Sequence, residues 1–312
     1  MITIGQWAKW FRMLAGTSVQ HALQGPGHFY AKDKIVGYYN DLRNKVHLTK
    51  ELDNSGIPIH LLASGQRVYL PTAVAQYGLG AYDLYLETGE MVYRQKALTC
   101  AGWLVKNQDQ RGGWDIWHRI GTYSPILYSA MTQGEGASLL FRAAMETGDT
   151  NYFKQAERAL ELMLLPLSLG GTSRMEQGRL YLEEYVGEPP NTILNGWVFA
   201  IFGLYDGVLA TSRDDFRQSL SLTVGTLANE LQHYDAEYWS YYDQRGCLAS
   251  PFYHRLHLAL LQICVDLFEV DQLKNYLLRW QGYQGKLINR SRAFAIKAWQ
   301  KLREPGQVVI VK

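Results

Sequence analysis

The sequence is short of cysteine, of net charge and of long apolar runs, and each shortage excludes a class of protein. Its three cysteines in 312 residues are too few and too scattered for a disulfide framework or a zinc cluster. The 31 lysines and arginines nearly balance the 29 acidic residues, and a net charge of +2 argues against a surface that coats nucleic acid. No stretch approaches about eighteen consecutive apolar residues, so the sequence predicts no membrane span.

The amino terminus also lacks the apolar core of a signal peptide, because Lys9 and Arg12 interrupt it. We therefore expect a cytoplasmic protein. With 47% apolar and 19% charged residues, the chain is globular and long enough for a sizeable core. Aromatic residues are plentiful: 21 tyrosines and nine tryptophans, many in polar, glycine-rich stretches. Such rings either pack in a core or form platforms for flat, hydroxyl-rich ligands.

The chain repeats one plan four times, in which a helical run, a short polar turn and a second helical run follow each other. The four copies span residues 72–108, 130–165, 195–232 and 253–283. The first run of each copy is apolar nearly all round, as in an inner helix covered by neighbours. We therefore predict an all-α core that forms an incomplete α/α toroid, a partial (α/α)6-like barrel, of about four helical hairpins with short β-hairpins in its loops. An open solenoid of the same hairpins, a binding scaffold, is the alternative.

The sequence predicts two parts. Residues 1–60 hold two helix-like stretches, 7–23 and 33–43, and are expected to cap the toroid or to pair two subunits as a homodimer. Residues 61–312 are expected to form the toroid itself, and the last seven residues, GQVVIVK, are typical of a terminal strand.

Most signatures of cofactor and metal chemistry are missing. The glycines of GLGAY and QGEGAS lie inside helical runs, where they favour close helix packing rather than a dinucleotide site. His254 and His257 stand three apart on a predicted helix, but no third ligand has suitable spacing. Neither a GxSxG nor a Cys/His nucleophile pattern is present. We therefore expect no cofactor and no metal.

Two loops combine tyrosine with charge, and each directly precedes a predicted inner helix. The first carries Glu184 and Tyr185, and the second carries Tyr242, Arg245 and Tyr253. Both should open at the same end of the toroid. Tyrosine has a pKa near 10, so it acts as a base only beside a cation or strong hydrogen-bond donors. Arg245 is one such cation. The alternative is that these tyrosines are packed rings with hydrogen-bonded hydroxyls.

Four blocks of the chain resemble the C-terminal domain of the D-glucuronyl C5-epimerase family, whose enzymes convert glucuronic to iduronic acid in heparan-type chains. The blocks are LPTAVAQYGLGAY (70–82), YSAMTQGEGASLLFRAA (128–144), EEYVGEPPNTILNGWVFAIFGLYD (183–206) and YYDQRGCLASPFYH with RLH (241–257). They stand in the family's order, and the resemblance covers about residues 60–285. The N-terminal β-rich domain and the membrane anchor of the animal members have no counterpart here.

The resemblance implies an isomerase that inverts C5 of glucuronate to give iduronate in a uronic-acid polysaccharide such as heparosan, without a cofactor. It implies catalytic roles for Tyr185, Tyr242 and Tyr253, with Glu184 beside them. It also places Arg245 and Asn195 in the substrate cleft. Further substrate-binding candidates, from their places in the matching blocks or adjoining loops, are Gln133, His254, Arg119 and Arg174.

The chemistry agrees with these residue types. The C5 hydrogen of a hexuronate is α to a carboxylate, and its removal creates an enolate-like dianion. The enzyme must therefore neutralise the carboxylate and place a proton-transfer group on each face of the ring. Arginine can hold a carboxylate at two points. Tyr185, with Glu184, and Tyr253 come from different loops, as facing groups must.

Three other functions remain open at this point. A polysaccharide lyase removes the same proton and then expels the C4 substituent. A glycoside hydrolase needs two facing carboxylic acids, which Glu184 with Asp115 or Glu135 would supply. A non-catalytic glycan-binding repeat would use the tryptophan and tyrosine platforms alone. Neither nucleic acid nor a membrane is an expected partner.

Overall fold

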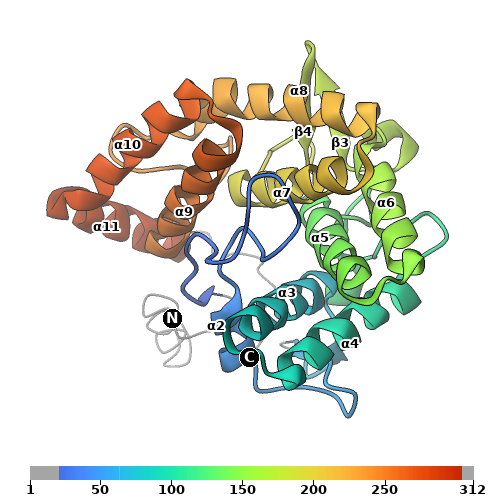
Figure 1. Ribbon diagram of the computed structural model, residues 1–312. Coiled ribbons are helices and arrows are strands. Elements are labelled where there is room, and N and C mark those ends of the chain that lie inside the picture. Colours follow the sequence, from blue (N-terminus) through green and yellow to red (C-terminus); the bar gives the residue numbers. More distant parts are fainter. Residues whose placement is uncertain (1–20, 63, 304–312) are drawn as a thin grey trace.

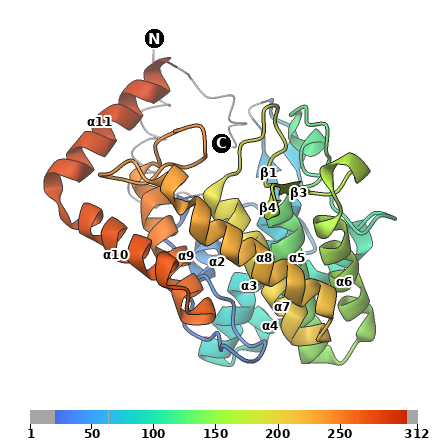
Figure 2. The same cartoon turned by 90° about the horizontal axis from the view of Figure 1, so that it is seen from above.

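The computed structural model describes residues 21–62 and 64–303, and within them four helical hairpins form an arc (Figure 1). The hairpins are α3 (Pro71–Thr88) with α4 (Met91–Asn107), α5 (Ala130–Thr147) with α6 (Thr150–Leu164), α7 (Leu194–Thr211) with α8 (Asp214–Glu230), and α9 (Pro251–Phe268) with α10 (Asp271–Gly285). The fold is an incomplete α/α toroid with an all-α core, as the repeats predict. The helix α11 (Leu287–Arg303) follows α10 at an angle, at the edge of the arc (Figure 2), and contacts both α10 and α9.

The hairpin turns are made by residues that accept a left-handed backbone. Gly89 and Gly148 end α3 and α5 with φ near +73°, which glycine adopts without strain. Asp149 then caps α6 by accepting a hydrogen bond from the amide of Asn151. The turns ETGE (87–90) and ETGD (146–149) therefore both end a helix, and the second also caps the helix that follows.

The inner helices α3, α5, α7 and α9 pack side by side, and glycine sets the closest approach. A Cβ added to Gly203 of α7 would lie 2.3 Å from the Cα of Gly134 in α5. This contact confirms the prediction that the glycine of QGEGAS serves helix packing. Of the helices in the described residues, α7 alone is long and apolar enough to cross a membrane by length and composition, but 72% of it is buried inside the fold. That is weak support for a span, because a core helix passes the same test.

Short elements complete the structure at the ends of the hairpins. The strands β1 (His60–Leu61) and β2 (Arg67–Val68) form one antiparallel pair, and β3 (Ser173–Glu176) and β4 (Arg179–Leu182) form another. The helix α2 (Arg43–Leu48) packs against α3. Single 3-10 turns are η2 (His118–Ile120), η3 (Leu167–Leu169) and η4 (Leu231–Tyr234).

The predicted helix over residues 33–43 is wrong. The chain is irregular until α2 begins at Arg43, because its backbone groups pair with residues 25–29 and with the hairpins instead of forming helical hydrogen bonds. The amide of Tyr38 donates to Asp83 of α3, and the carbonyl of Gly37 accepts from Arg142 of α5. The predicted helix 7–23 lies almost wholly, and the terminal strand 306–312 wholly, outside the described residues. The division at residue 60 and the homodimer stay predictions.

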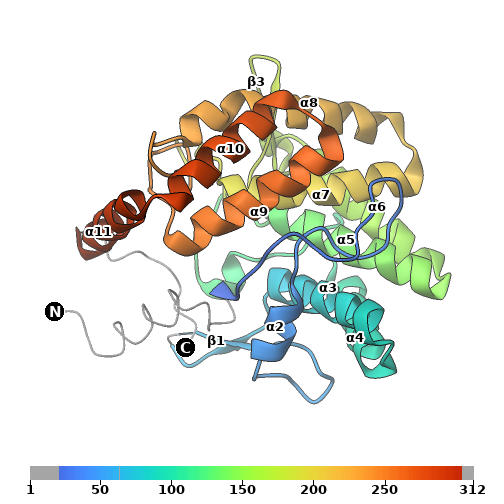
Figure 3. The same cartoon turned by 60° about the vertical axis from the view of Figure 1, so that its left-hand side comes forward.

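A buried set of side chains, the anchor network, holds this N-terminal segment (residues 21–62) in place. Arg142 pairs with Asp206 at 2.6 Å, and both side chains are almost fully buried. The hydroxyl of Tyr39 donates to the other oxygen of Asp206 at 2.7 Å, and the Arg142 guanidinium lies over the rings of Tyr38 and Tyr39. Figure 3 shows the segment crossing the toroid on its way to α2. It therefore belongs to the packed body of the fold.

Candidate functional site

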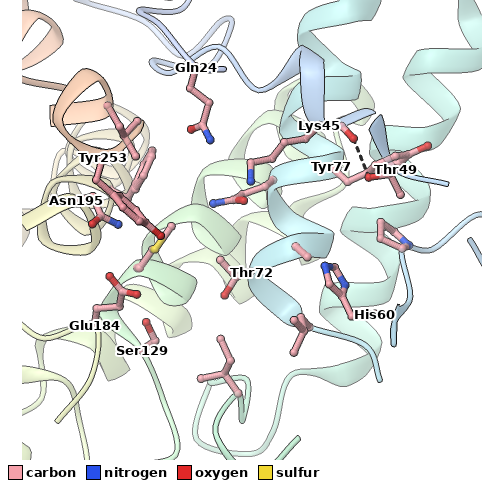
Figure 4. Close-up of a pocket in the computed structure, with 18 of the residues that line it drawn as sticks. Gln24, Lys45, Thr49, His60, Thr72, Tyr77, Ser129, Glu184, Asn195 and Tyr253 are labelled. Carbon is pink, nitrogen blue, oxygen red and sulfur yellow. Dashed lines mark hydrogen bonds between the residues drawn. The ribbon is translucent and has the colours of Figure 1, made fainter. Parts of the chain in front are cut away.

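A cavity of about 250 Å³ lies where the four inner helices begin (Figure 4). It is lined by residues from the first turns of α3, α5, α7 and α9, by the loops that precede them, and by residues of the N-terminal segment. The amino-terminal ends of helices carry partial positive charge, so four of them around one cavity favour an anionic ligand.

Two sets of polar side chains face each other across this cavity in Figure 4. Glu184, Asn195 and Tyr253 form one side, here called the α7–α9 wall. Lys45 and His60, together with Gln76 of α3, form the other side, here called the α2–α3 wall. The sequence blocks predicted the first wall and missed the second.

The chain positions Glu184 through the β3–β4 hairpin. After β4, the amide of Glu183 donates to Thr172 and its carbonyl accepts from the amide of Ala130 at the start of α5. The next side chain then turns toward the first residues of α7. A Cβ added to Gly196 would lie 2.1 Å from Oε2 of Glu184. Glycine at this position therefore makes room for the carboxyl group.

The carboxyl group of Glu184 has properties of a proton-transfer group. Burial raises its pKa from 4.5 to about 7. Its Oε2 is shielded from solvent and has no hydrogen-bond partner among the described residues. A nearby negative charge on Glu184 in turn raises the pKa of Tyr242 and of Tyr253. A carboxyl that titrates near neutrality beside a cavity is suited to general acid–base chemistry.

Tyr253 lies in the first turn of α9, which Ser250 caps by accepting a hydrogen bond from the amide of Tyr253 at 3.3 Å. Its ring packs edge-on against Tyr242 with centroids 4.7 Å apart. Burial raises the pKa of Tyr253 to about 12, although a hydrogen bond from Tyr242 acts in the opposite direction. Tyr253 is therefore a neutral hydroxyl donor at ordinary pH. Tyr242 stands behind it and does not line the cavity.

Asn195, the second residue of α7, completes this wall. Its side chain is 4% exposed, and its Oδ1 has no hydrogen-bond partner among the described residues. A buried carbonyl oxygen without a partner at the edge of a cavity is suited to accept a hydrogen bond from a ligand.

Tyr185 lies beside the cavity but does not line it. Its hydroxyl donates to the carbonyl of Tyr123 at 3.1 Å, and its ring packs edge-on against Trp117, which is itself part of the lining. In this structure Tyr185 therefore positions Trp117.

The three predicted arginines do not reach the cavity, and no arginine of the described chain lines it. Arg245 donates to the carbonyl of Pro189, and Arg119 donates to that of Asp115. Arg174 is paired with Glu183 at 2.9 Å and lies over the ring of Tyr181. Each guanidinium is engaged by a backbone carbonyl or a carboxylate outside the cavity, so the expected arginine clamp on the substrate carboxylate is not formed by these residues in this structure.

Gln133 and His254 are fully buried and hold the fold together instead of facing the cavity. The amide of Gln133 donates to the carbonyls of Gly112 and Ala159. His254 stacks on Trp239 with ring centroids 3.7 Å apart, and its Nδ1 accepts from the amide of Ser240. The prediction that these two residues contact the substrate is therefore wrong for this structure, because both side chains are buried away from the cavity.

The residues that sequence reasoning missed lie on the α2–α3 wall. Lys45 is 8% exposed, and Gln76 donates to both oxygens of Glu135 at 2.9 and 3.0 Å. Burial lowers the pKa of Lys45 and raises that of Glu135, and the opposite charges of the two attract each other. Burial also lowers the pKa of His60 to about 4, so this imidazole is neutral. The sequence gives little signal for this wall, because Lys45 stands in the mostly polar stretch RNKVHL.

Metal binding has no obvious location in the parts of the chain that the structure describes. Within residues 21–62 and 64–303, no group of three or more histidine, cysteine, aspartate or glutamate side chains is arranged to hold a metal ion.

Comparison with known proteins assigns the chain to a protein family. The family model described as "D-glucuronyl C5-epimerase C-terminus" matches residues 108–282. The D-glucuronyl C5-epimerase of Caenorhabditis elegans is 32% identical over 208 residues, which cover 59% of this chain and 34% of the worm protein. An uncharacterized protein of Methanocaldococcus jannaschii is 28% identical over 132 residues, which cover 41% of this chain and 43% of that protein. The family resemblance read from the four sequence blocks is confirmed.

The chain spans about a third of the length of the worm relative and less than half of the archaeal one. Among solved structures, a protein from Listeria innocua aligns with a TM-score of 0.50 at 13% sequence identity, over 75% of this chain and 73% of that one. A likeness at this identity concerns the fold alone.

Proposed function

The chain belongs to the D-glucuronyl C5-epimerase family, and from this premise we propose that it inverts C5 of glucuronate residues in a uronic-acid polysaccharide to give iduronate. The observation that carries the proposal is the α7–α9 wall. It sets the Glu184 carboxyl, whose pKa is about 7, close to the hydroxyl of Tyr253 at a cavity surrounded by four helix amino termini.

In the proposed reaction, ionised Glu184 takes the proton from C5. The electron pair of the broken C–H bond moves into the carboxylate of the sugar and gives an enolate-like dianion. The hydroxyl of Tyr253 then delivers a proton to C5 on the other face of the ring, which inverts the centre. Glu184 and Tyr253 come from different elements, the β4–α7 loop and the first turn of α9, so a ring that enters between them has one group at each face.

The site then returns to its starting state without an outside group. After inversion Glu184 is protonated and Tyr253 is a phenolate, whose pKa is raised to about 12 against about 7 for Glu184. Because Glu184 lies close enough for its charge to raise the pKa of Tyr253, the proton passes from Glu184 back to Tyr253. Atoms and charges therefore balance over one turnover, with no cofactor.

Incubation of the protein with heparosan in deuterium oxide tests the proposal. We expect deuterium at C5 and both C5 epimers by NMR, an unchanged polymer length and no rise in near-ultraviolet absorbance. Chain shortening with growing absorbance would identify a lyase, because β-elimination leaves a 4,5-unsaturated uronate. Absence of exchange with every glucuronate polymer tried, while Glu184→Gln behaves like the parent, would contradict the epimerase proposal.

A further inference from the structure

The site described so far lacks the group that neutralises the carboxylate of the sugar. Proton removal at C5 places a second negative charge next to that carboxylate, so a cation within the cavity lowers the barrier. The arginines that the sequence suggested are bound to carbonyl or carboxylate groups outside the cavity. Among the described residues that line the cavity, the one lysine or arginine is Lys45.

Lys45 is held firmly where it is. It lies on α2, whose packing on α3 depends on Gly80, because a Cβ there would come within 2.4 Å of the Leu42 carbonyl. Just before α2, residues 37–39 are fixed by the anchor network. A side chain that is 8% exposed and directed into a cavity from such a support has little freedom to turn elsewhere.

Two ionisable groups among the described residues act on Lys45, and the acidic one lies outside the cavity lining. Glu135 attracts Lys45, but it is fully buried, does not line the cavity, and has both oxygens bound by Gln76. The second of these groups is His60, and its like charge, if present, would oppose that of Lys45. Across the cavity stand Glu184, Asn195 and Tyr253 (Figure 4).

We propose that Lys45 binds the carboxylate of the glucuronate, so that the N-terminal segment, which lies outside the family match at residues 108–282, completes the active site. The inference rests on the proposed function and adds the substrate group that the α2–α3 wall recognises. A sugar held by its carboxylate at Lys45 spans the cavity and presents its ring to Glu184 and Tyr253. The helix amino termini around the cavity support the same negative charge.

Binding of carboxylated and uncarboxylated sugar tests the proposal without relying on turnover. Calorimetry would compare a heparosan oligosaccharide with its carboxyl-reduced counterpart, in which each glucuronate has become glucose. We expect the parent protein to prefer the carboxylated form at least tenfold, and Lys45→Met to bind both forms equally. Lys50→Met, which changes an exposed lysine two residues after α2, should keep the preference. A preference retained by Lys45→Met would overturn the inference.

A double variant separates binding of substrate from a merely structural role. If Lys45 serves only to balance the buried charge of Glu135, then Lys45→Met with Glu135→Gln removes both charges and restores C5 exchange. We expect the double variant to be folded by circular dichroism and to exchange C5 at least 100-fold more slowly than Glu135→Gln alone. Near-equal rates in the double variant and in Glu135→Gln would overturn the proposal. This comparison remains valid even where Lys45→Met alone fails to fold.

Failure of the proposed function gives a different pattern. In that case the parent protein discriminates between the two oligosaccharides in calorimetry, and Lys45→Met abolishes the discrimination, but deuterium never enters C5. Lys45 would then be the carboxylate-binding residue of a site with another activity.

Discussion

The two walls of the cavity use buried ionisable groups in opposite ways. On the α7–α9 wall, no hydrogen bond from the described residues holds the buried Oε2 of Glu184, whereas Oε1 of its neighbour Glu183 accepts from both Arg174 and Thr192. Behind the α2–α3 wall, both oxygens of Glu135 are bound by Gln76. A carboxyl that a guanidinium or an amide holds is fixed, whereas one that no such group holds can exchange a proton with a ligand. We therefore expect the α7–α9 wall to carry out proton transfer and the α2–α3 wall to bind and position the substrate.

The sharpest test of this contrast compares the adjacent glutamates. We expect Glu184→Gln to slow C5 exchange about 1000-fold, because the amide cannot take a proton. Glu183→Gln should keep the rate within about threefold and lower the free energy of unfolding by about 1–3 kcal/mol, since it weakens the bond to Arg174. NMR exchange rates and urea unfolding measure the two effects. Equal loss of rate in both variants would break the distinction between reacting and holding carboxyls.

The second test ranks the three tyrosines by their distance from the cavity. We expect Tyr253→Phe to lose about 100-fold in exchange rate, because phenylalanine keeps the ring and deletes the proton donor. Tyr242→Phe removes a hydrogen bond to Tyr253 and should lose less. Tyr185→Phe should lose least, about threefold, since its hydroxyl meets only the carbonyl of Tyr123. If Tyr185→Phe proved the most damaging, the loop over residues 117–123 would have to rearrange when substrate binds.

The third test is the pH dependence of exchange. Because the pKa of Glu184 is about 7, the ionised base becomes scarcer below that pH. We therefore expect the exchange rate to fall about tenfold per pH unit below pH 7 and to level off above it. A rate that is flat between pH 5 and pH 7 would show that the base titrates elsewhere.

Stability should change with pH in the opposite sense. The pKa of Glu184 is raised from 4.5 to about 7 in the folded state, so the folded protein binds more protons than the unfolded chain in that window. The free energy of unfolding from this group therefore falls as pH rises from about 4.5 to 7, by a contribution on the order of 3 kcal/mol. Glu184→Gln should remove this contribution and be the more stable protein at pH 8, as measured by urea unfolding.

The smallest effect is expected at Arg245. The guanidinium donates to the carbonyl of Pro189 and lies outside the cavity lining. Arg245→Lys should therefore change the exchange rate less than about threefold. A tenfold loss would instead support the two-point carboxylate grip that the sequence suggested, and it would require the loop before α7 to move. Arg245→Lys is thus the direct counterpart of Lys45→Met.

Local patterns in the sequence predicted the scaffold and half of the site. The ETG turns and the apolar first runs specify hairpins through contacts close in sequence, and the positions of Glu184, Asn195 and Tyr253 follow because each lies at or just before the start of an inner helix. Arg245 was misplaced because a long side chain can turn toward either side of its loop. Lys45 was missed because its place is set by contacts such as Tyr39 with Asp206, which lie 167 residues apart.

The anchor network also sets an order of events during synthesis. Tyr39 leaves the ribosome 167 residues before Asp206, the acceptor of its hydroxyl. At about 5–20 residues per second, the N-terminal segment waits roughly 10–30 seconds for its partner. Over that time the aromatic pair Tyr38 and Tyr39, almost fully buried in the finished protein, has no third hairpin to cover it. A nascent chain stalled before residue 206 should thus present these rings to a chaperone, and one stalled well beyond it should not.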